Sequence, residues 1–242
     1  MIEKVLILPD VHLTQKGYAK PYELVKKFMK SYKPHKTVLL GDFMDCEAIS
    51  HWNENKRLTM EGIRWEKELE VANRELDYIQ EYSGHVIYLE GNHEDWTGVY
   101  TEKNPGMGGF VDIPKNLNIF KRGMEWVKYG DLYEIGKMIF VHGLYISIYH
   151  AKKHLLAIGD HVCYGHAHNA QTHQLNMRRQ DPYMAYGLGC LCDHAPAYMK
   201  NKHANWMNQF AIMEWNTKMG NFNLTPINIT DNQFIYGGKQ YK

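Results

Sequence analysis

Residues 5–12 read VLILPDVH: four apolar residues, a proline that ends the run, and then an aspartate and a histidine two positions apart. Two further apolar runs end in a similar way, with TVLLGDFMD at residues 37–45 and VIYLEGNHE at residues 86–94. Short apolar runs that stop at proline, glycine or a carboxylate are typical of buried parallel strands. The sequence therefore predicts three strands, each followed by a loop that carries acidic, amide or histidine side chains.

Helices and further strands are predicted between and after these three strands. Residues 21–32 and 61–82 are predicted helices, and the second has one apolar stripe, made of Trp65, Leu69, Ala72, Leu76 and Ile79. Residues 96–118 contain Pro105-Gly106 and Gly108-Gly109 and are predicted to be loop with little regular structure. Further strands are predicted over residues 138–141, 161–164, 184–188, 210–215 and 222–229, and a further helix over residues 147–158.

Strand-helix-strand units thus come first and mostly strands follow, which predicts a layered α/β domain with a second sheet packed on the first. The chain has 242 residues and shows no linker, repeat or low-complexity segment. This length is ample for one hydrophobic core, so we expect a single domain over residues 1–242.

Composition restricts the class of protein further. With 28 Lys+Arg against 27 Asp+Glu, the net charge of +1 gives no case for an obligate polyanion binder. No apolar run approaches the ~20 residues that a membrane span needs, so no membrane partner is expected. The N-terminal apolar run is too short for a signal peptide, and the four cysteines form no CxxC pair. We therefore expect a protein of the reducing cytoplasm.

The polar side chains at the strand ends are the candidate functional residues, since ligands bind outside the carboxyl ends of strands in open α/β sheets. Two histidine motifs join the three strand ends already quoted. The five motifs are Asp10-Val11-His12, Gly41-Asp42-Phe43-Met44-Asp45, Gly91-Asn92-His93-Glu94, Val141-His142-Gly143 and Gly165-His166-Ala167-His168. Carboxylate, imidazole and amide donors fit a pair of divalent ions such as Mn, Fe, Zn or Co better than Ca or a thiolate site.

In this order, the five motifs resemble those of the calcineurin-like metallophosphoesterase superfamily, over Asp10 through His168. The resemblance implies an α/β fold: a four-layer αββα sandwich of two mixed sheets with a binuclear metal site at the strand C-terminal ends. It implies two divalent metal ions, with Mn²⁺ the first choice and Fe, Zn, Ni or Co as alternatives. One ion would be bound by Asp10, His12, Asp42 and His168, and the other by Asp42, Asn92, His142 and His166, so that Asp42 bridges them.

The resemblance also assigns the catalytic residues. His93 matches the catalytic histidine of the superfamily, which lies near the leaving-group oxygen and not on a metal, and Asp45 matches the acid that holds this histidine in place. A hydroxide that bridges the metals would attack phosphorus, since two cations lower the pKa of a shared water. An imidazole beside Asp45 would assist the leaving alkoxide.

Two positions separate this chain from the protein Ser/Thr phosphatases of the superfamily, which carry arginines where it has Cys46 and Glu90. The chain looks nearer to phage and bacterial phosphoesterases and to the repair-exonuclease branch. We therefore predict hydrolysis of a phosphodiester, with nucleic acid or a nucleotide as the favoured substrate. The alternatives are a phosphomonoesterase and a non-catalytic scaffold. Such scaffolds typically lose the catalytic histidine or several ligands, and here His93, Asp45 and all seven ligand positions are present.

Other polar and aromatic residues are expected to lie on the surface or to pack loops, with no part in catalysis. The C-x-C spacing of Cys190 and Cys192 is poor for structural zinc and predicts a loop beside the active site. His150 and His154 are predicted to be surface residues. Contacts with phosphates or nucleobases are an alternative to surface exposure and loop packing for Lys56-Arg57, Lys121-Arg122, Lys152-Lys153, Arg178-Arg179, Trp96, Tyr100, Phe110, Tyr198 and Trp206.

Overall fold

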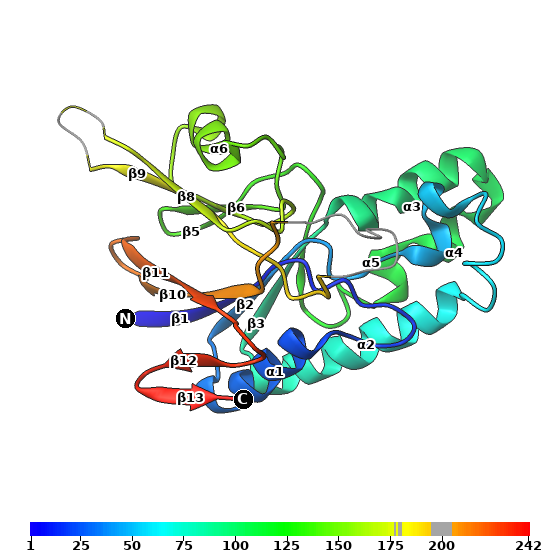
Figure 1. The fold of residues 1–242 in the computed structure, drawn as a ribbon, viewed down its shortest axis with the longest axis horizontal. Coiled ribbons are helices and arrows are strands. Elements are labelled where there is room, and N and C mark those ends of the chain that lie inside the picture. The colour runs from blue at the N-terminus through cyan, green and yellow to red at the C-terminus, as the bar shows by residue number, and fades with distance from the viewer. Residues whose placement is uncertain (177, 179–180, 195–204) are drawn as a thin grey trace.

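The computed structural model describes residues 1–176, 178, 181–194 and 205–242, whose strands form two large mixed sheets and one small hairpin (Figure 1). The first sheet contains β1 (Ile2–Leu8), β2 (Lys36–Leu40), β3 (His85–Leu89), β4 (Glu125–Val127), β10 (Gln209–Asn216) and β11 (Phe222–Asn228). Its strand order is β11-β10-β1-β2-β3-β4. Strands β1 to β4 are parallel, and β10 pairs antiparallel with both β1 and β11.

The second sheet has the order β5-β6-β7-β9-β8. Its strands are β5 (Tyr133–Ile135), β6 (Met138–Val141), β7 (Val162–Tyr164), β8 (Gln171–Leu175) and β9 (Tyr183–Gly187). The three central strands are parallel, while β5 and β8 are antiparallel edges. Strands β12 (Phe234–Tyr236) and β13 (Lys239–Tyr241) form the hairpin, which packs Phe234 against Phe28.

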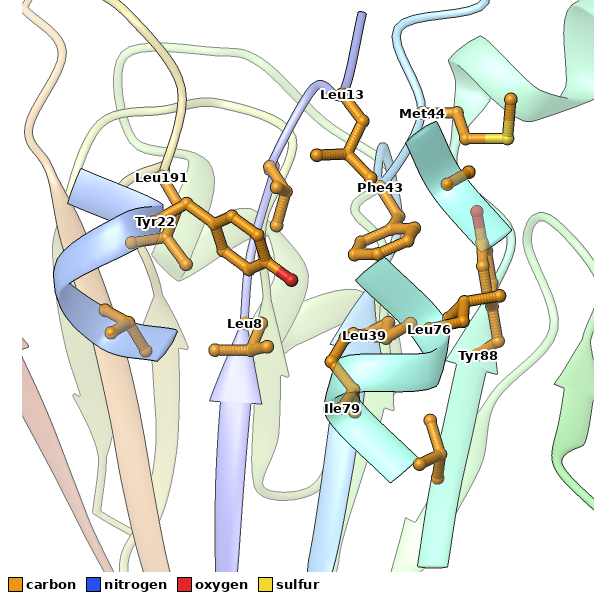
Figure 2. Close-up of a cluster of buried hydrophobic side chains, with 14 of the residues drawn as sticks. Leu8, Leu13, Tyr22, Leu39, Phe43, Met44, Leu76, Ile79, Tyr88 and Leu191 are labelled. Atoms are coloured by element: carbon orange, nitrogen blue, oxygen red, sulfur yellow. The ribbon is translucent and has the colours of Figure 1, made fainter. Parts of the chain in front are cut away.

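Helices cover the outer faces of both sheets. Helices α1 (Lys20–Tyr32) and α2 (Trp65–Tyr82) lie on the first sheet, and α6 (His150–Ile158) lies on the second (Figure 1). The side chains of β1 alternate between two buried clusters, as the period of two in a strand requires. Leu6 and Leu8 pack toward α1 and α2, whereas Val5 and Ile7 pack between the two sheets. Figure 2 shows the helix-facing cluster around Leu8, with Tyr22 of α1 and Leu76 and Ile79 of α2.

A third buried cluster joins α6 to the second sheet through Ala151, Leu155, Val162 and Ala185. The order of the layers is therefore helices, first sheet, second sheet, helix, with an apolar cluster between each pair of layers. This arrangement confirms the predicted four-layer αββα sandwich of two mixed sheets. It also explains why the central strands are apolar on both faces, since each is covered on both sides.

The predicted loop over residues 96–118 is wrong, because much of this region is helical. It contains the greater part of α3 (Asn92–Lys103), a 3-10 helix (Pro105–Met107), α4 (Gly108–Val111) and α5 (Ile113–Asn116). Helix α3 begins directly at the third motif, where the side chain of Glu94 accepts a hydrogen bond from the backbone N–H of Gly91. This is the reciprocal half of a capping box, and it starts a helix that has no apolar stripe to predict it.

Two smaller expectations also need correction. Helix α2 begins at Trp65, not at residue 61, because Gly62 has a left-handed φ of 78° and Arg64 is extended. The surface position predicted for His150 and His154 is wrong, since both lie on the buried face of α6. His150 Nδ1 lies 2.6 Å from the hydroxyl of Tyr164, and the His154 ring stacks on the Tyr164 ring at 3.6 Å.

The loops that follow the parallel strands are joined to one another by backbone hydrogen bonds. The N–H of His12 donates to the carbonyl of Asp42 at 2.9 Å, which ties the loop after β1 to the loop after β2. The N–H of Gly165 donates to the carbonyl of His142 at 2.7 Å, which ties the loop after β7 to the loop after β6. The N–H of His166 donates to the Asp10 carboxylate at 3.0 Å and joins the two sets of loops, so the candidate functional loops lie at one end of both sheets. Across the described residues, none of the helices is both long and apolar enough to cross a bilayer.

Candidate metal centre

The structure brings the predicted ligands from both sheets into two clusters of side-chain donors. One consists of Asp10, His12, Asp42 and His168, and within it the donor atoms lie within 4.8 Å of one another. The other contains Asp42, His142 and His166 at the same spacing. Asp42 belongs to both clusters, which is the position a bridging carboxylate would occupy.

In the first cluster, the imidazoles turn their Nε2 atoms toward the carboxylates. His168 Nε2 lies 3.2 Å from Asp10 Oδ1 and 3.2 Å from His12 Nε2, and His12 Nε2 lies 3.7 Å from Asp42 Oδ2. The Asp10 carboxylate is completely buried, and both of its oxygens accept from the backbone N–H of His166 at 3.0 Å. The orientation of this carboxylate is therefore fixed by the loop that carries the histidine ligands.

In the second cluster, His142 is the central group. Its Nε2 lies 3.3 Å from Asp42 Oδ2 and 3.0 Å from the side-chain oxygen of Asn92, which places Asn92 beside the cluster. Its Nδ1 lies 2.9 Å from the carbonyl of Leu40. Because a carbonyl oxygen can only accept, Nδ1 carries the proton and the lone pair of the neutral ring is on Nε2, which faces the carboxylate.

The acidic and histidine side chains of the centre strongly shift one another's pKa values. Burial alone would raise the pKa of the Asp42 carboxyl, but His142 and His93 face it and hold this pKa well below its usual range. In return, although burial opposes a charged ring, Asp42 raises the pKa of His142 to about 9. A buried, ionised carboxylate needs a nearby positive charge, and divalent cations satisfy the same requirement.

His93 lies beside the two clusters and contacts Asp45. Its Nδ1 donates to the backbone carbonyl of Asp45 at 2.8 Å and lies 3.2 Å from the Asp45 carboxylate, while its Nε2 lies 3.8 Å from Asp42 Oδ2. The Trp96 ring stacks on the imidazole at a centroid distance of 3.9 Å. Burial lowers the pKa of His93, but Asp42 and Asp45 outweigh this effect and raise it to about 10. The ring is therefore held in one orientation, with its Nε2 toward Asp42.

Asp45 has a wider role than its resemblance implies, because it contacts two histidines. Its Oδ1 lies 2.8 Å from His12 Nδ1 as well as 3.2 Å from His93 Nδ1. Burial would raise the pKa of the Asp45 carboxyl, but hydrogen bonds from His12 and His93 hold it well below its usual range. The ionised carboxylate thus accepts from Nδ1 of His12 and leaves its Nε2 facing the first cluster.

The backbone of the candidate ligands is strained. Five of them have a left-handed φ although none is glycine: Asp10 (45°), His12 (51°), Asp42 (47°), His166 (67°) and His168 (55°). Such a conformation costs about 1–2 kcal/mol for a residue with a Cβ. Strain of this kind persists where surrounding structure imposes it and is common at functional sites.

Glycines beside the ligands permit the close approach of the loops. Gly41 has a φ of 87°, and a Cβ there would collide with the ring of His142. A Cβ at Gly165 would collide with the Asp10 carboxylate. The glycines at these two positions therefore allow ligands from the two sheets to meet.

Glu94 is a buried acid that joins the loop after β2 to the loop after β3. Its carboxylate accepts from the backbone N–H of Asp42 at 3.1 Å, of Met44 at 2.9 Å and of Gly91 at 2.9 Å, and from the Tyr88 hydroxyl at 2.9 Å. All four partners are donors, so both carboxylate oxygens are needed as acceptors. Glu94 thus positions the backbone that carries the shared carboxylate, although it is not itself in either cluster.

We predict that Glu94→Gln lowers both stability and activity, because the amide group would point a donor at backbone N–H groups. A buried donor left without a partner costs about 1–3 kcal/mol, and a displacement of about 1 Å in a catalytic group can cost up to about 100-fold in rate. Thermal unfolding and kcat/KM on an aryl phosphate ester measure the two effects.

The matched control is Glu68→Gln. Glu68 is also completely buried, but one of its oxygens accepts from the backbone N–H of Ala48 at 3.2 Å and the other has no hydrogen-bond partner among the described residues, so glutamine can turn its amide nitrogen to that side. Burial and neighbouring carboxylates raise the pKa of both acids, to about 8 for Glu68 and about 7 for Glu94, so the contrast between them lies in their hydrogen bonds. Equal effects from the two replacements would contradict the positioning role of Glu94.

The donor set fits divalent cations of the Mn, Fe, Zn or Co type. Carboxylate oxygen, imidazole nitrogen and an amide oxygen converge, and the protonated Nδ1 atoms of His12 and His142 are engaged by a carboxylate and a carbonyl, as in outer shells of metal sites. The fold and this cluster together define a metallophosphoesterase. A family model described as calcineurin-like phosphoesterase matches residues 3–218, so the chain belongs to this family and is a metal-dependent hydrolase of phosphate esters. No curated protein matches the chain.

Some contacts near the centre are not part of the sequence prediction. They are the hydrogen bonds of Glu94 to the loops and two contacts of His168, with the ring of Trp206 at 4.4 Å and with the thiol of Cys192 at 3.9 Å from Nδ1. The predicted place of the C-x-C segment beside the active site is confirmed by the second of these contacts. Arg179 and Tyr198 lie outside the described residues.

Proposed function

We propose that this protein hydrolyses phosphodiesters at a centre of two divalent cations, with Mn²⁺ as the favoured ion and nucleic acid or a nucleotide as the favoured substrate. The observation that carries the proposal is the shared carboxylate of Asp42, which has the first ligand cluster on one side and the second on the other. Asp10, His12 and His168 would complete one site, and Asn92, His142 and His166 the other. Two cations held this way supply an activated water and neutralise charge on a phosphoryl group.

The protein groups have separate roles in this proposal. His93, fixed by Asp45 and Trp96, donates a proton to the leaving alkoxide, for which an imidazole Nε2 near the centre is suited. Asp45 keeps the proton on Nδ1 of His93 and stabilises the charged ring. Asp45 also orients His12, so the proton donor and the first metal site are aligned by one carboxylate.

The charge around the centre supports a diester over a monoester. Cys46 is completely buried, and the half-buried Glu90 carboxylate accepts from the backbone N–H of Tyr129 at 3.0 Å, so neither position supplies a cation. A phosphomonoester dianion carries one more negative charge than a diester and calls for additional cationic donors. A diester monoanion needs less compensation.

A cavity of about 400 Å³ beside His93 has room for an ester group. It is lined by Asp45, Glu47, Ser50, Trp52, Asn53, Lys56, Asn92, His93 and Trp96. Among the described residues of this lining, Lys56 is the one lysine or arginine, and Trp52 is 67% exposed. An exposed tryptophan next to a single cation suits a flat group attached to a phosphate, which supports a nucleotide or nucleic acid.

A cytoplasmic location is part of the same proposal. The four cysteines are free and buried, which is the state favoured in a reducing compartment.

We expect kcat/KM for bis(p-nitrophenyl) phosphate to exceed that for p-nitrophenyl phosphate by about tenfold or more, equivalent to about 1.4 kcal/mol in transition-state binding. Both substrates release the same chromophore, so one assay at a fixed Mn²⁺ concentration compares them. Single-stranded and linear DNA in the same buffer test the favoured substrate class. Asp42→Asn protein prepared in parallel gives the background from contaminating phosphatases. A higher kcat/KM for the monoester would contradict the proposal and favour a phosphomonoesterase.

A further inference from the structure

A buried thiol lies directly behind one of the candidate ligands. Cys192 Sγ is 3.9 Å from Nδ1 of His168, and both residues are almost fully buried. Cys192 also forms a group with His12 and His168 in which the donor atoms lie within 4.8 Å of one another. The thiol is therefore part of the surroundings of the first ligand cluster.

The position of this thiol is fixed by the ligand residues themselves. The N–H of Leu191, the residue before it, donates to the carbonyl of Asp10 at 3.0 Å. The carbonyl of Cys192 accepts from the side-chain amide of Asn208 at 2.9 Å, and the N–H of the adjacent Met207 donates to the carbonyl of His168 at 2.9 Å. The thiol loop is thus attached to the backbone of both Asp10 and His168.

The two nitrogens of His168 face different groups. Nε2 faces the ligand cluster, 3.2 Å from Asp10 Oδ1 and 3.2 Å from His12 Nε2. Nδ1 faces Cys192. A histidine that binds a metal through one nitrogen almost always donates the other N–H to an acceptor, which fixes the tautomer and the plane of the ring. His142 uses the carbonyl of Leu40 and His12 uses the carboxylate of Asp45 in this way.

We propose that Cys192 is the outer-shell partner of His168: its sulfur accepts the Nδ1–H, so that the Nε2 lone pair faces the cation of the first cluster. This inference rests on the proposed function, because it assumes the ligand set assigned there. Sulfur accepts a hydrogen bond more weakly than the carboxylate and the carbonyl that serve His12 and His142. The sulfur partner makes Cys192 a residue that sets the affinity of one metal site and not of the other.

The test is a Mn²⁺ titration of the metal-free protein, followed by calorimetry and by electron paramagnetic resonance. The unmodified chain should bind two ions and show the spectrum of a coupled pair. Cys192→Ala should bind one ion as before and the other about 10- to 100-fold more weakly, the usual loss for an outer-shell partner. At a Mn²⁺ concentration between the two affinities, this variant should show the spectrum of a single, uncoupled ion.

Two further variants separate a positioning role from a structural one. Cys163→Ala removes another buried thiol, on β7 in the cluster between the sheets, and should leave both affinities unchanged. Cys192→Asn places an amide oxygen, which reaches further from Cβ than a sulfur atom, toward Nδ1 and should restore most of the lost affinity. A purely structural defect would not be rescued by a polar side chain in a buried position.

Several outcomes would overturn the inference. Unchanged affinity at both sites in Cys192→Ala, or an equal loss at both sites with no rescue by Cys192→Asn, would show that the thiol does not position His168. A sulfur-to-metal charge-transfer band in the Co²⁺ protein that Cys192→Ala removes would make Cys192 a direct ligand instead. A single ion in the unmodified chain would overturn the paired centre of the proposed function, a result that the variant is not needed to obtain.

Discussion

Asp42→Asn is expected to reduce phosphoester hydrolysis to background and to lower the metal content from the proposed two ions per chain to fewer than one. The carboxylate belongs to both ligand clusters, so its replacement by a neutral amide weakens both sites at once. Asparagine retains Oδ1, which accepts from the backbone N–H of His93 at 2.9 Å, so the loop geometry should be preserved. Metal content by mass spectrometry after Mn²⁺ loading and dialysis measures the effect independently of any substrate.

The control for this replacement is Glu75→Gln, which also neutralises a buried carboxylate. Glu75 pairs with Lys26 on the helical side of the first sheet and is not a member of either ligand cluster. Its replacement should lower stability and leave the metal content unchanged. If Asp42→Asn still binds two ions with ordinary affinity, Asp42 is not the bridge.

His93→Ala is expected to lower kcat on esters with poor leaving groups by about two to four orders of magnitude, the usual contribution of a general acid. Metal content should remain near that of the unmodified chain, because the hydrogen bond from the backbone N–H of His93 to Asp42 is retained and the side chain is not an assigned ligand. An activated p-nitrophenyl ester needs less protonation of the leaving group and should lose less. A series of aryl diesters of increasing leaving-group pKa measures this difference.

His93→Gln is the second variant in this experiment, since alanine also removes the ring on which Trp96 stacks. Glutamine fills more of that space but does not supply an acid of suitable pKa. Both variants should therefore show the same steeper dependence on the leaving group. A loss of bound metal in either one would instead place His93 among the ligands.

Much of the fold could be predicted because its central strands are short apolar runs with sharp ends. Val5 to Leu8 are apolar without interruption because β1 is covered on both faces, and Pro9 marks its end. Helix α2 could be predicted from its stripe. Helix α3 could not, because the one side chain it fully buries is that of Glu94, so it has no apolar periodicity. Its formation depends on a cap and on tertiary contacts of the motif that it begins.

For the candidate site, the positions of the ligands could be predicted, but the contacts that hold them could not. The rule that ligands gather at the carboxyl ends of strands places Asp10, Asp42 and Asn92 together without knowledge of the structure. It does not reveal that the Glu94 carboxylate holds two loops together. In the sequence, a glutamate that follows a histidine cannot be distinguished from an ordinary glutamate at the start of a helix. The rule also does not reveal the contact between Cys192 and His168, because the C-x-C spacing predicts a loop beside the active site but not which side chain the thiol meets. The left-handed φ values at Asp10 and His12 could not be predicted either, because neither residue type by itself indicates this conformation.

Strand β1 lies inside the first sheet, and its neighbour on one side is β10, which pairs with Ile2 to Ile7 through residues 211–216. Strand β1 is thus completed by a strand that comes much later in the chain. Until residue 216 has been synthesised, one edge of β1 has no partner from this sheet, and the loop with Asp10 and His12 follows that unfinished strand. Assembly of the centre therefore has to wait for the synthesis of β10, and shortened chains that end before residue 209 would display an unpaired apolar strand edge open to aggregation.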